Sequence, residues 1–287
     1  MLNKVEVSLE VLRVVKELSF VKRKCSVLEN IWPSEISAFG ATDLGQKRRV
    51  NEDGFVINER MGLSLVVDGM GGHDDGVIAT QMILNNFQAK LDCYFHKGFP
   101  KQYPYGEARA FLADVIEHVN TSVYKNNIDR GYGEGTGMGA VIAGLWWVEP
   151  GKRAIVFHVG DSRLYLFRKG DLTQLTVDHT MYQLWKMRGE FGHPPPSNIV
   201  FRALGPRKNV VPDIQLMDFV QDDVILLCSD GLSSVVSQAE IAAMMTEHSG
   251  DLSSLPQELI AQANAKGGPD NITAVVVSVG ALLPPGG

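Results

Sequence analysis

The sequence predicts an α+β fold in which antiparallel sheets are covered by helix pairs. Two observations lead to this class. Short runs rich in Val, Ile, Leu and aromatic residues are closed by Asp, Gly and Asn, and two long helical patterns follow one another with no strand between them. A doubly wound parallel sheet alternates strands with single helices, so the consecutive helices argue against it. The 29 glycines are suited to the tight turns of such a fold.

The first element in chain order is an N-terminal extension, residues 1–36, which is predicted to be helical. Its apolar residues recur at helical spacing: Val5, Leu9, Leu12, Val15 and Leu18. A basic cluster follows at 22–24, and Pro33 then breaks the pattern. Two interpretations stay open for this extension, a helix that packs on the main domain and a docking element for a partner.

The main domain is predicted over residues 37–280, and residues 281–287 form a short tail. Its strands are predicted at Leu63–Val67, Ala140–Val148, Ala154–Val159, Leu164–Phe167, Val224–Cys228 and Ile272–Val279. Its long helices are marked by two apolar faces, the first with Ile78, Met82, Ile83 and Phe87, the second with Phe111, Leu112, Val115, Ile116, Val119 and Val123. Shorter helices are predicted at Met181–Arg188, Ala239–Glu247 and Leu255–Ala265.

The composition is that of a soluble globular enzyme and excludes several other classes. The chain has 27 basic and 33 acidic side chains, a net charge of −6, which argues against a nucleic-acid binder. Its 3 cysteines are far apart, so no disulfide framework is predicted and a reducing cytoplasm fits. The longest strongly apolar stretch, Ala140–Val148, is shorter than the roughly 20 residues that cross a bilayer. We therefore expect a cytoplasmic monomer without membrane contact.

The most informative feature is the position of the acidic residues. Each of five acidic groups adjoins a strand-like run: Glu52-Asp53, Asp68-Gly69, Asp161, Asp230-Gly231 and Asp270-Asn271. A single Asp-Gly is most simply a turn. Several carboxylates at the ends of buried strands are costly to desolvate unless something neutralises them. Because strand ends gather at one rim of a packed sheet, we expect these acids to share a site.

The type of ligand points to a hard divalent cation. Oxygen donors without Cys or His pairs at zinc spacing favour Mg²⁺ or Mn²⁺. The 7 histidines form no such pattern, so each is expected to be structural or exposed. Arg48 and Arg49 precede the first acidic pair, and a guanidinium beside a metal cluster is suited to binding a phosphate with two hydrogen bonds.

An ordered set of motifs completes the pattern. They are Arg48–Asp53 (RRVNED), Val67–His73 (VDGMGGH), Gly135–Gly137 (GTG), His158–Arg163 (HVGDSR), Asp178–Thr180 (DHT), Arg202–Gly205 (RALG), Ser229–Gly231 (SDG) and Asp270-Asn271. In this order they resemble the metal-dependent Ser/Thr protein phosphatases of type 2C, and in particular their bacterial branch. The resemblance covers about residues 37–280. It implies a four-layer α-β-β-α sandwich with the metals at one end.

The resemblance also implies roles for individual residues. Asp68 would bridge two Mn²⁺ or Mg²⁺ ions, the Gly69 carbonyl would bind one of them, and Asp230 and Asp270 would complete the other shell. Glu52 and Asp53 would hold metal-bound waters. Arg48 would bind the phosphate. Asp161, with Asp230, would hold a third, weaker metal.

The implied reaction is hydrolysis of phosphoserine and phosphothreonine on proteins, opposing a Ser/Thr kinase, by a water that bridges two metal ions. No phosphoenzyme is needed. Some relatives place a histidine directly after the Asp-Gly, where this chain has Met70; His73 lies three residues on, so the general acid stays unassigned. Residues 179–201 match the family's variable flap. Two interpretations of this flap stay open: it selects substrates, or it is a packed surface subdomain.

Other chemistries find less support in the sequence. The segment Gly135–Ala140 fits a dinucleotide fingerprint but leads into a strand-like run, and there is no P-loop motif. None of the three cysteines is followed six residues later by an arginine, as a cysteine-dependent phosphatase requires, and no Asp-x-Asp pair is present. The remaining alternative is a non-catalytic phosphoprotein-binding scaffold of the same fold. Such a scaffold should lack acids of the cluster.

Overall fold

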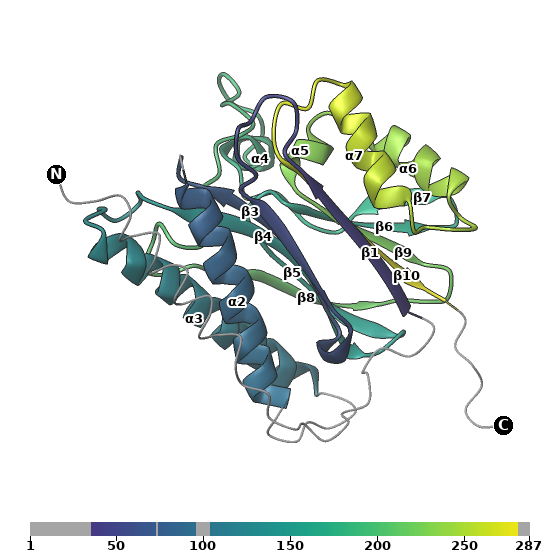
Figure 1. Cartoon of the computed structure of the whole chain (residues 1–287), viewed down its shortest axis with the longest axis horizontal. Helices are drawn as coiled ribbons and strands as arrows, with labels where there is room; N and C mark the ends of the chain where they lie inside the picture. Colours follow the sequence, from purple (N-terminus) through teal and green to yellow (C-terminus); the bar gives the residue numbers. More distant parts are fainter. Residues whose placement is uncertain (1–35, 73, 96–103, 281–287) are drawn as a thin grey trace, which may run out of the picture.

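The computed structural model describes residues 36–72, 74–95 and 104–280. Figure 1 shows two antiparallel sheets packed face to face, with helices on the outer side of each. The first sheet has the order β1 (Ile36–Asp43), β10 (Ile272–Val279), β9 (Val224–Cys228), β6 (Arg163–Arg168) and β7 (Asp171–Gln174). The second has the order β2 (Asp53–Asn58), β3 (Leu63–Met70), β4 (Gly139–Glu149), β5 (Arg153–Val159) and β8 (Asp213–Asp218).

Three apolar cores hold four layers together. Helices α2 (Asp75–Phe95) and α3 (Tyr105–Asp129) bury Phe87, Leu112 and their neighbours against the second sheet. The central core lies between the two sheets. Helices α6 (Gln238–Glu247) and α7 (Leu255–Ala265) cover the first sheet. The α+β four-layer sandwich expected from the sequence is confirmed.

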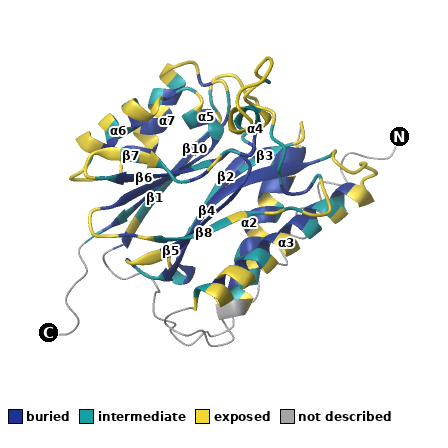
Figure 2. Cartoon of the chain, turned by 180° about the vertical axis from the view of Figure 1, so that it is seen from behind, coloured by how far each residue is buried: buried dark blue, intermediate teal, exposed yellow. Residues whose placement is uncertain are grey.

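The strands that the sequence analysis did not assign are the four edge strands. All six predicted runs are strands, and they occupy the central positions of the two sheets. The missing ones are β1, β2, β7 and β8. Central strands such as β4 and β9 are buried almost throughout, whereas β7 and β8 alternate between exposed and partly buried residues (Figure 2). Edge strands such as β7 and β8 are therefore more polar and lack the continuous apolar run used to find the others, whereas β2 contains the short apolar run that follows Asp53.

The remaining elements are short or lie at boundaries. They are η1 (Glu59–Met61), α4 (Met181–Met187) and α5 (Asp230–Ser233). The predicted helical extension and the tail lie outside the described residues, and β1 already begins at Ile36. No helix in the described part of the chain is long and apolar enough to cross a membrane.

One predicted helix face needs correction. Ile78 was grouped with Met82, Ile83 and Phe87, but Ile78 is exposed. The buried face of α2 instead runs through Ala79, Ile83, Phe87 and Leu91, which recur every four residues along the helix. Trp146, Trp147 and Cys228, which stand in apolar runs, are fully buried in the core.

Candidate metal centre

Strand register brings the predicted acids to one end of the sandwich. Asp53 and Asp68 are directly paired residues of the β2–β3 ladder. Asp161 lies in the turn between β5 and β6. Asp230 follows the end of β9, and Asp270 precedes β10, its antiparallel neighbour. Because neighbouring antiparallel strands place the end of one beside the start of the next, residues far apart in sequence meet here.

A pocket of about 260 Å³ opens at this end. Its lining consists of Arg48, Glu52, Asp68, Gly69, Met70, Gly71, Gly72, Val141, Asp161, Asn198, Val200, Asp230 and Asp270. All the site residues predicted from sequence are among them except Asp53. The Asp53 carboxylate lies behind the pocket wall, where its Oδ2 accepts hydrogen bonds from Ser229 Oγ and Thr273 Oγ1, both at 2.7 Å.

The carboxylates repel one another in the absence of a cation. Burial, together with the charges of Asp53 and Asp230, holds the pKa of Asp68 well above its ordinary value. Burial is also the main cause that raises the pKa of Asp53 to about 7 and that of Asp161 to about 7. The pKa of Asp230 is raised by burial and by the charge of Asp270. A bound cation would reverse this repulsion, so the donor set fits a hard divalent metal ion.

One guanidinium lies at the mouth of the pocket. Arg48 Nη2 donates to Asp270 Oδ2 at 2.6 Å, and its Nη1 lies 4.0 Å from Glu52 Oε2. The Arg48 side chain is 46% exposed. A second nearby cation, Arg163, does not line the pocket; its side chain is only 27% exposed, and its Nη2 donates to Asp178 Oδ2 at 2.6 Å. Arg48 is therefore the arginine that can meet an anion entering from solvent.

Asn271 supports the loop that carries Arg48 and Glu52. Its Nδ2 donates to the carbonyls of Leu44 and Val50, at 2.9 and 3.0 Å, and its Oδ1 accepts the Glu52 amide at 2.9 Å. The sequence analysis placed Asn271 in a motif but gave it no role, and it gave none to Ser229 or Thr273. The sequence does indicate that all three residues place a hydroxyl or amide group near an aspartate at a strand end. A single sequence does not show which group each of them hydrogen-bonds to.

The Asp-Gly pairs at Asp68 and Asp230 are sites of close packing rather than turns. A Cβ on Gly69 would lie 2.6 Å from the Glu52 carbonyl oxygen, and the Gly69 amide donates to that oxygen at 3.2 Å. A Cβ on Gly231 would lie 1.9 Å from the Asn271 carbonyl oxygen. Neither glycine has a positive φ. Glycine at these positions lets three chain segments approach each other behind the acids.

The segment 179–201 closes one side of the pocket. An isolated bridge joins Thr180 to Val200 at its base, and Asn198 and Val200 line the pocket. Farther out, Met187 and Phe191 are 70% and 82% exposed. Met70 lines the pocket, whereas His73 lies outside the described residues.

Comparisons with known proteins bear on the family and the fold of the chain. The sequence profile described as protein phosphatase 2C matches residues 46–265. The chain is 32% identical to the protein phosphatase PhpP of Streptococcus pneumoniae over 249 residues, which cover 83% of this chain and 95% of PhpP. The structure of the serine/threonine phosphatase PstP/Ppp of Mycobacterium tuberculosis superposes with a TM-score of 0.74 at 30% identity, covering 86% of this chain and 99% of that chain.

A further solved structure bears on the metal. It is that of the catalytic domain of the phosphatase PstP in complex with two manganese ions, and it superposes with a TM-score of 0.72 at 30% identity. The superposition covers 86% of this chain and 99% of the catalytic domain.

Proposed function

Since the chain belongs to the protein phosphatase 2C family and is a protein serine/threonine phosphatase, we propose that it hydrolyses its substrates with water and two divalent ions in the carboxylate pocket. The substrates are phosphoserine and phosphothreonine side chains of proteins. The observation that carries this proposal is the meeting of Asp68, Asp230 and Asp270 in one pocket beside Arg48. It also disfavours the scaffold alternative, because no acid of the cluster is missing.

The residues of the pocket divide into metal ligands and supports. We assign Asp68, the Gly69 carbonyl, Asp230 and Asp270 as ligands of two Mn²⁺ or Mg²⁺ ions, and Asp161 with Asp230 as the site of a third. Glu52 and Asp53 are assigned to hold metal-bound waters, and the Ser229 and Thr273 hydroxyl groups that donate to Asp53 Oδ2 fix its orientation. When bound, the ions would neutralise these carboxylates, acidify a water molecule and offset charge on the phosphoryl group.

The chain's own groups then bind and orient the substrate. Arg48 is placed to donate to phosphoryl oxygens once an ion competes for Asp270, its present partner. Among the described residues of the lining, none carries a hydroxyl, thiol or imidazole group. Since the carboxylates of the lining are assigned to the metal ions and their waters, water is the nucleophile that suits this pocket, and the proposed hydrolysis needs no phosphoenzyme. Met70 has no proton to donate to the leaving group, so the general acid is a different group.

The surroundings of the pocket suggest how a protein substrate binds. The exposed Met187 and Phe191 present apolar surface on the flap, whose Asn198 and Val200 line the pocket. We propose that this flap contacts residues flanking the phosphorylated side chain, and that a Ser/Thr kinase of the same cell supplies the substrates. We also propose that residues 37–280 act as one catalytic unit, as a monomer in the cytoplasm.

The test is metal-dependent hydrolysis by the purified full chain. Turnover of 4-nitrophenyl phosphate and of a phosphothreonine peptide should require Mn²⁺ or Mg²⁺, disappear with a chelator and return with added metal. The variant Asp222→Asn is the control, and it should keep this metal-dependent turnover. Asp222 is an exposed acid near the opposite end of β9, and its positive φ is one that asparagine tolerates. Absence of turnover at every metal concentration, with intact binding of phosphoprotein, would instead support the scaffold.

A further inference from the structure

His179 joins the base of the flap to the turn that carries Asp161. Its backbone amide donates to the Gly160 carbonyl at 2.9 Å, and its ring Nδ1 accepts the Gly160 amide at 3.1 Å. Its own carbonyl accepts the amide of Phe201 at 2.9 Å. The side chain is buried, with 5% exposed. One residue thus binds both the start of the Asp161 turn and the returning end of the flap.

The outer edge of the imidazole is held by an ion pair. Since Nδ1 accepts a hydrogen bond, the neutral ring carries its proton on Nε2, which lies 3.4 Å from Asp213 Oδ2. Arg202 Nη1 bonds the other oxygen of Asp213 at 2.9 Å. Burial, with the nearby His158 and Arg202, lowers the pKa of His179 to about 4, so the ring is neutral at physiological pH.

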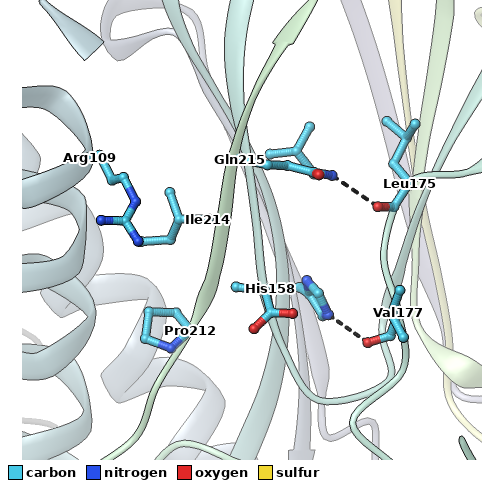
Figure 3. A pocket seen from close by; sticks show the side chains of 9 residues that line it. Arg109, His158, Leu175, Val177, Pro212, Ile214 and Gln215 are labelled. Carbon is cyan, nitrogen blue, oxygen red and sulfur yellow. Dashed lines mark hydrogen bonds between the residues drawn. The ribbon is translucent and has the colours of Figure 1, made fainter. Parts of the chain in front are cut away.

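This cluster is a hydrogen-bonded support and not a second metal site. One possible ligand atom from each of His158, His179 and Asp213 lies within 4.8 Å of the other two, near enough to share an ion. The Nδ1 lone pair of His179 is already used, so a metal on Nε2 would require a fully deprotonated ring, and the charge of Arg202 stands 3.0 Å from that atom. His158 donates Nε2–H to the Val177 carbonyl at 2.9 Å, as Figure 3 shows, and its ring stacks on His179.

The turn that His179 holds is packed directly on the wall of the pocket. Gly160 has φ +107, and a Cβ there would lie 2.1 Å from Val141 Cγ1. Val141 lines the pocket and pairs with Asp68 across the β3–β4 ladder. On the flap side, the Met181 amide bonds the Ile199 carbonyl at 2.8 Å, which sets the position of Val200 in the pocket lining. A shift of His179 would therefore displace two walls of the pocket together.

We propose that His179 is a positioning residue that sets the Asp161 carboxylate and the flap base relative to the main carboxylates. Its side chain acts through the Gly160 amide, its backbone carbonyl holds the Phe201 amide, and neither group touches substrate or metal. The inference rests on the proposed function for one point, the assignment of Asp161 as a metal ligand. The hydrogen bond between the Gly160 amide and His179 Nδ1, which positions the turn, does not depend on that assignment.

The test uses a matched pair of substitutions in the full chain. His179→Asn keeps an acceptor at the Nδ1 position, whereas His179→Leu has a similar size and branching but no acceptor. We expect His179→Leu to speed hydrogen exchange of the Gly160 amide by roughly tenfold, the size of effect of one lost hydrogen bond. The weakest Mn²⁺ affinity in calorimetry should fall by roughly tenfold, with the tighter sites unchanged. His179→Asn should stay within about threefold of wild type on both readouts.

A double substitution separates the two assignments. In an Asp161→Asn background, His179→Leu should cause no further loss of Mn²⁺ affinity, because the residue through which it acts is already gone. Additive losses, or equal losses in His179→Asn and His179→Leu, would overturn the positioning role. If Asp161→Asn leaves all Mn²⁺ binding intact while His179→Leu still frees the Gly160 amide, the metal assignment of Asp161 fails and the turn assignment holds. Zinc binding by wild type that His179→Asn abolishes would make the cluster a metal site and sink the proposal.

Discussion

Buried carboxylates stand near both ends of strand β9, and their surroundings differ. Asp223, just before the strand, has a side chain only 1% exposed and receives two hydrogen bonds from Arg168, at 2.6 and 2.7 Å. The Val220 amide adds a third at 2.7 Å. At the other end, Asp230 faces Asp68 and Asp270 across the pocket, and the Arg48 guanidinium is bonded to Asp270.

The difference shows which end of the fold is complete without a ligand. A buried carboxylate that meets its own guanidinium is neutralised by the chain itself. In a group of carboxylates whose nearest charges are mostly other carboxylates, burial and then mutual repulsion raise the pKa values of Asp53, Asp68, Asp161 and Asp230. A divalent cation would supply the opposite charge at this end. Four substitutions or conditions test this contrast.

The largest effect is expected for Asp230→Ala at the acidic end. It removes a ligand shared by the proposed ions, so kcat/KM for 4-nitrophenyl phosphate should fall at least roughly a thousandfold, about 4 kcal/mol of transition-state stabilisation. The metal-free variant should unfold no more easily than wild type, because one repelling charge is gone. Steady-state kinetics and thermal unfolding measure the two quantities. Near-normal turnover in a folded variant would remove Asp230 from the metal site.

The opposite result is expected for Arg168→Leu at the other end. It leaves the Asp223 carboxylate buried without its guanidinium, which should cost about 2–3 kcal/mol of unfolding free energy; the estimate is below that for a fully buried pair because Arg168 is partly exposed. Urea denaturation gives the free energy. The kcat of the folded enzyme should change little, and adding Asp223→Asn should restore part of the stability. Equal unfolding free energies of Arg168→Leu and wild type would contradict the claim that Arg168 neutralises the buried Asp223 carboxylate.

The contrast also predicts a pH dependence of the metal-free protein. Asp53 and Asp161 have ordinary pKa values of 3.8 and folded-state values of about 7, so the folded protein keeps protons that the unfolded chain releases. Their contribution to stability is fully present below about pH 4 and is lost as pH rises through about 7. The unfolding temperature of metal-free protein should therefore fall between pH 5.5 and pH 8.

Controls for this pH effect separate the carboxylates from the histidines. Saturating Mn²⁺ should largely abolish the decline, because a cation stabilises the ionised acids. The variant Asp161→Asn should show a shallower decline than wild type, while every histidine of the chain stays in place. A metal-free unfolding temperature that rises over this range would contradict the stored repulsion.

The two ends also differ in how far the sequence predicts them. The acids of the pocket can be predicted from the sequence because each follows or precedes an apolar run. The strands predicted from these runs are the central ones, which the sandwich buries on both faces. The partners behind the pocket were not readable. The hydrogen bond that Thr273 donates to Asp53 joins residues 220 positions apart, and the local spacing of residues does not predict such a contact.

Arg168 and Asp223 illustrate the same limit at the other end. Both look like ordinary surface charges in the sequence, and only the register of β6 beside β9 brings them together. The edge strands β7 and β8 were missed because half of each faces solvent. Sequence patterns thus predict what is buried on both faces, whereas pairing across sheets and at edges depends on the folded structure.

The smallest effect is expected for Arg48→Ala, which tests whether the guanidinium that lines the pocket binds the substrate or neutralises the acids. If Arg48 binds the phosphoryl group, KM for a phosphopeptide should rise about tenfold, or about 1.4 kcal/mol, with a smaller loss of kcat. Arg49→Ala is the matched control, since Arg49 is the exposed neighbour that does not line the pocket, and its KM should stay within about twofold of wild type. If Arg48 mainly neutralises Asp270, the variant would keep its KM and lose stability in the metal-free state, and the phosphate would be bound by another group.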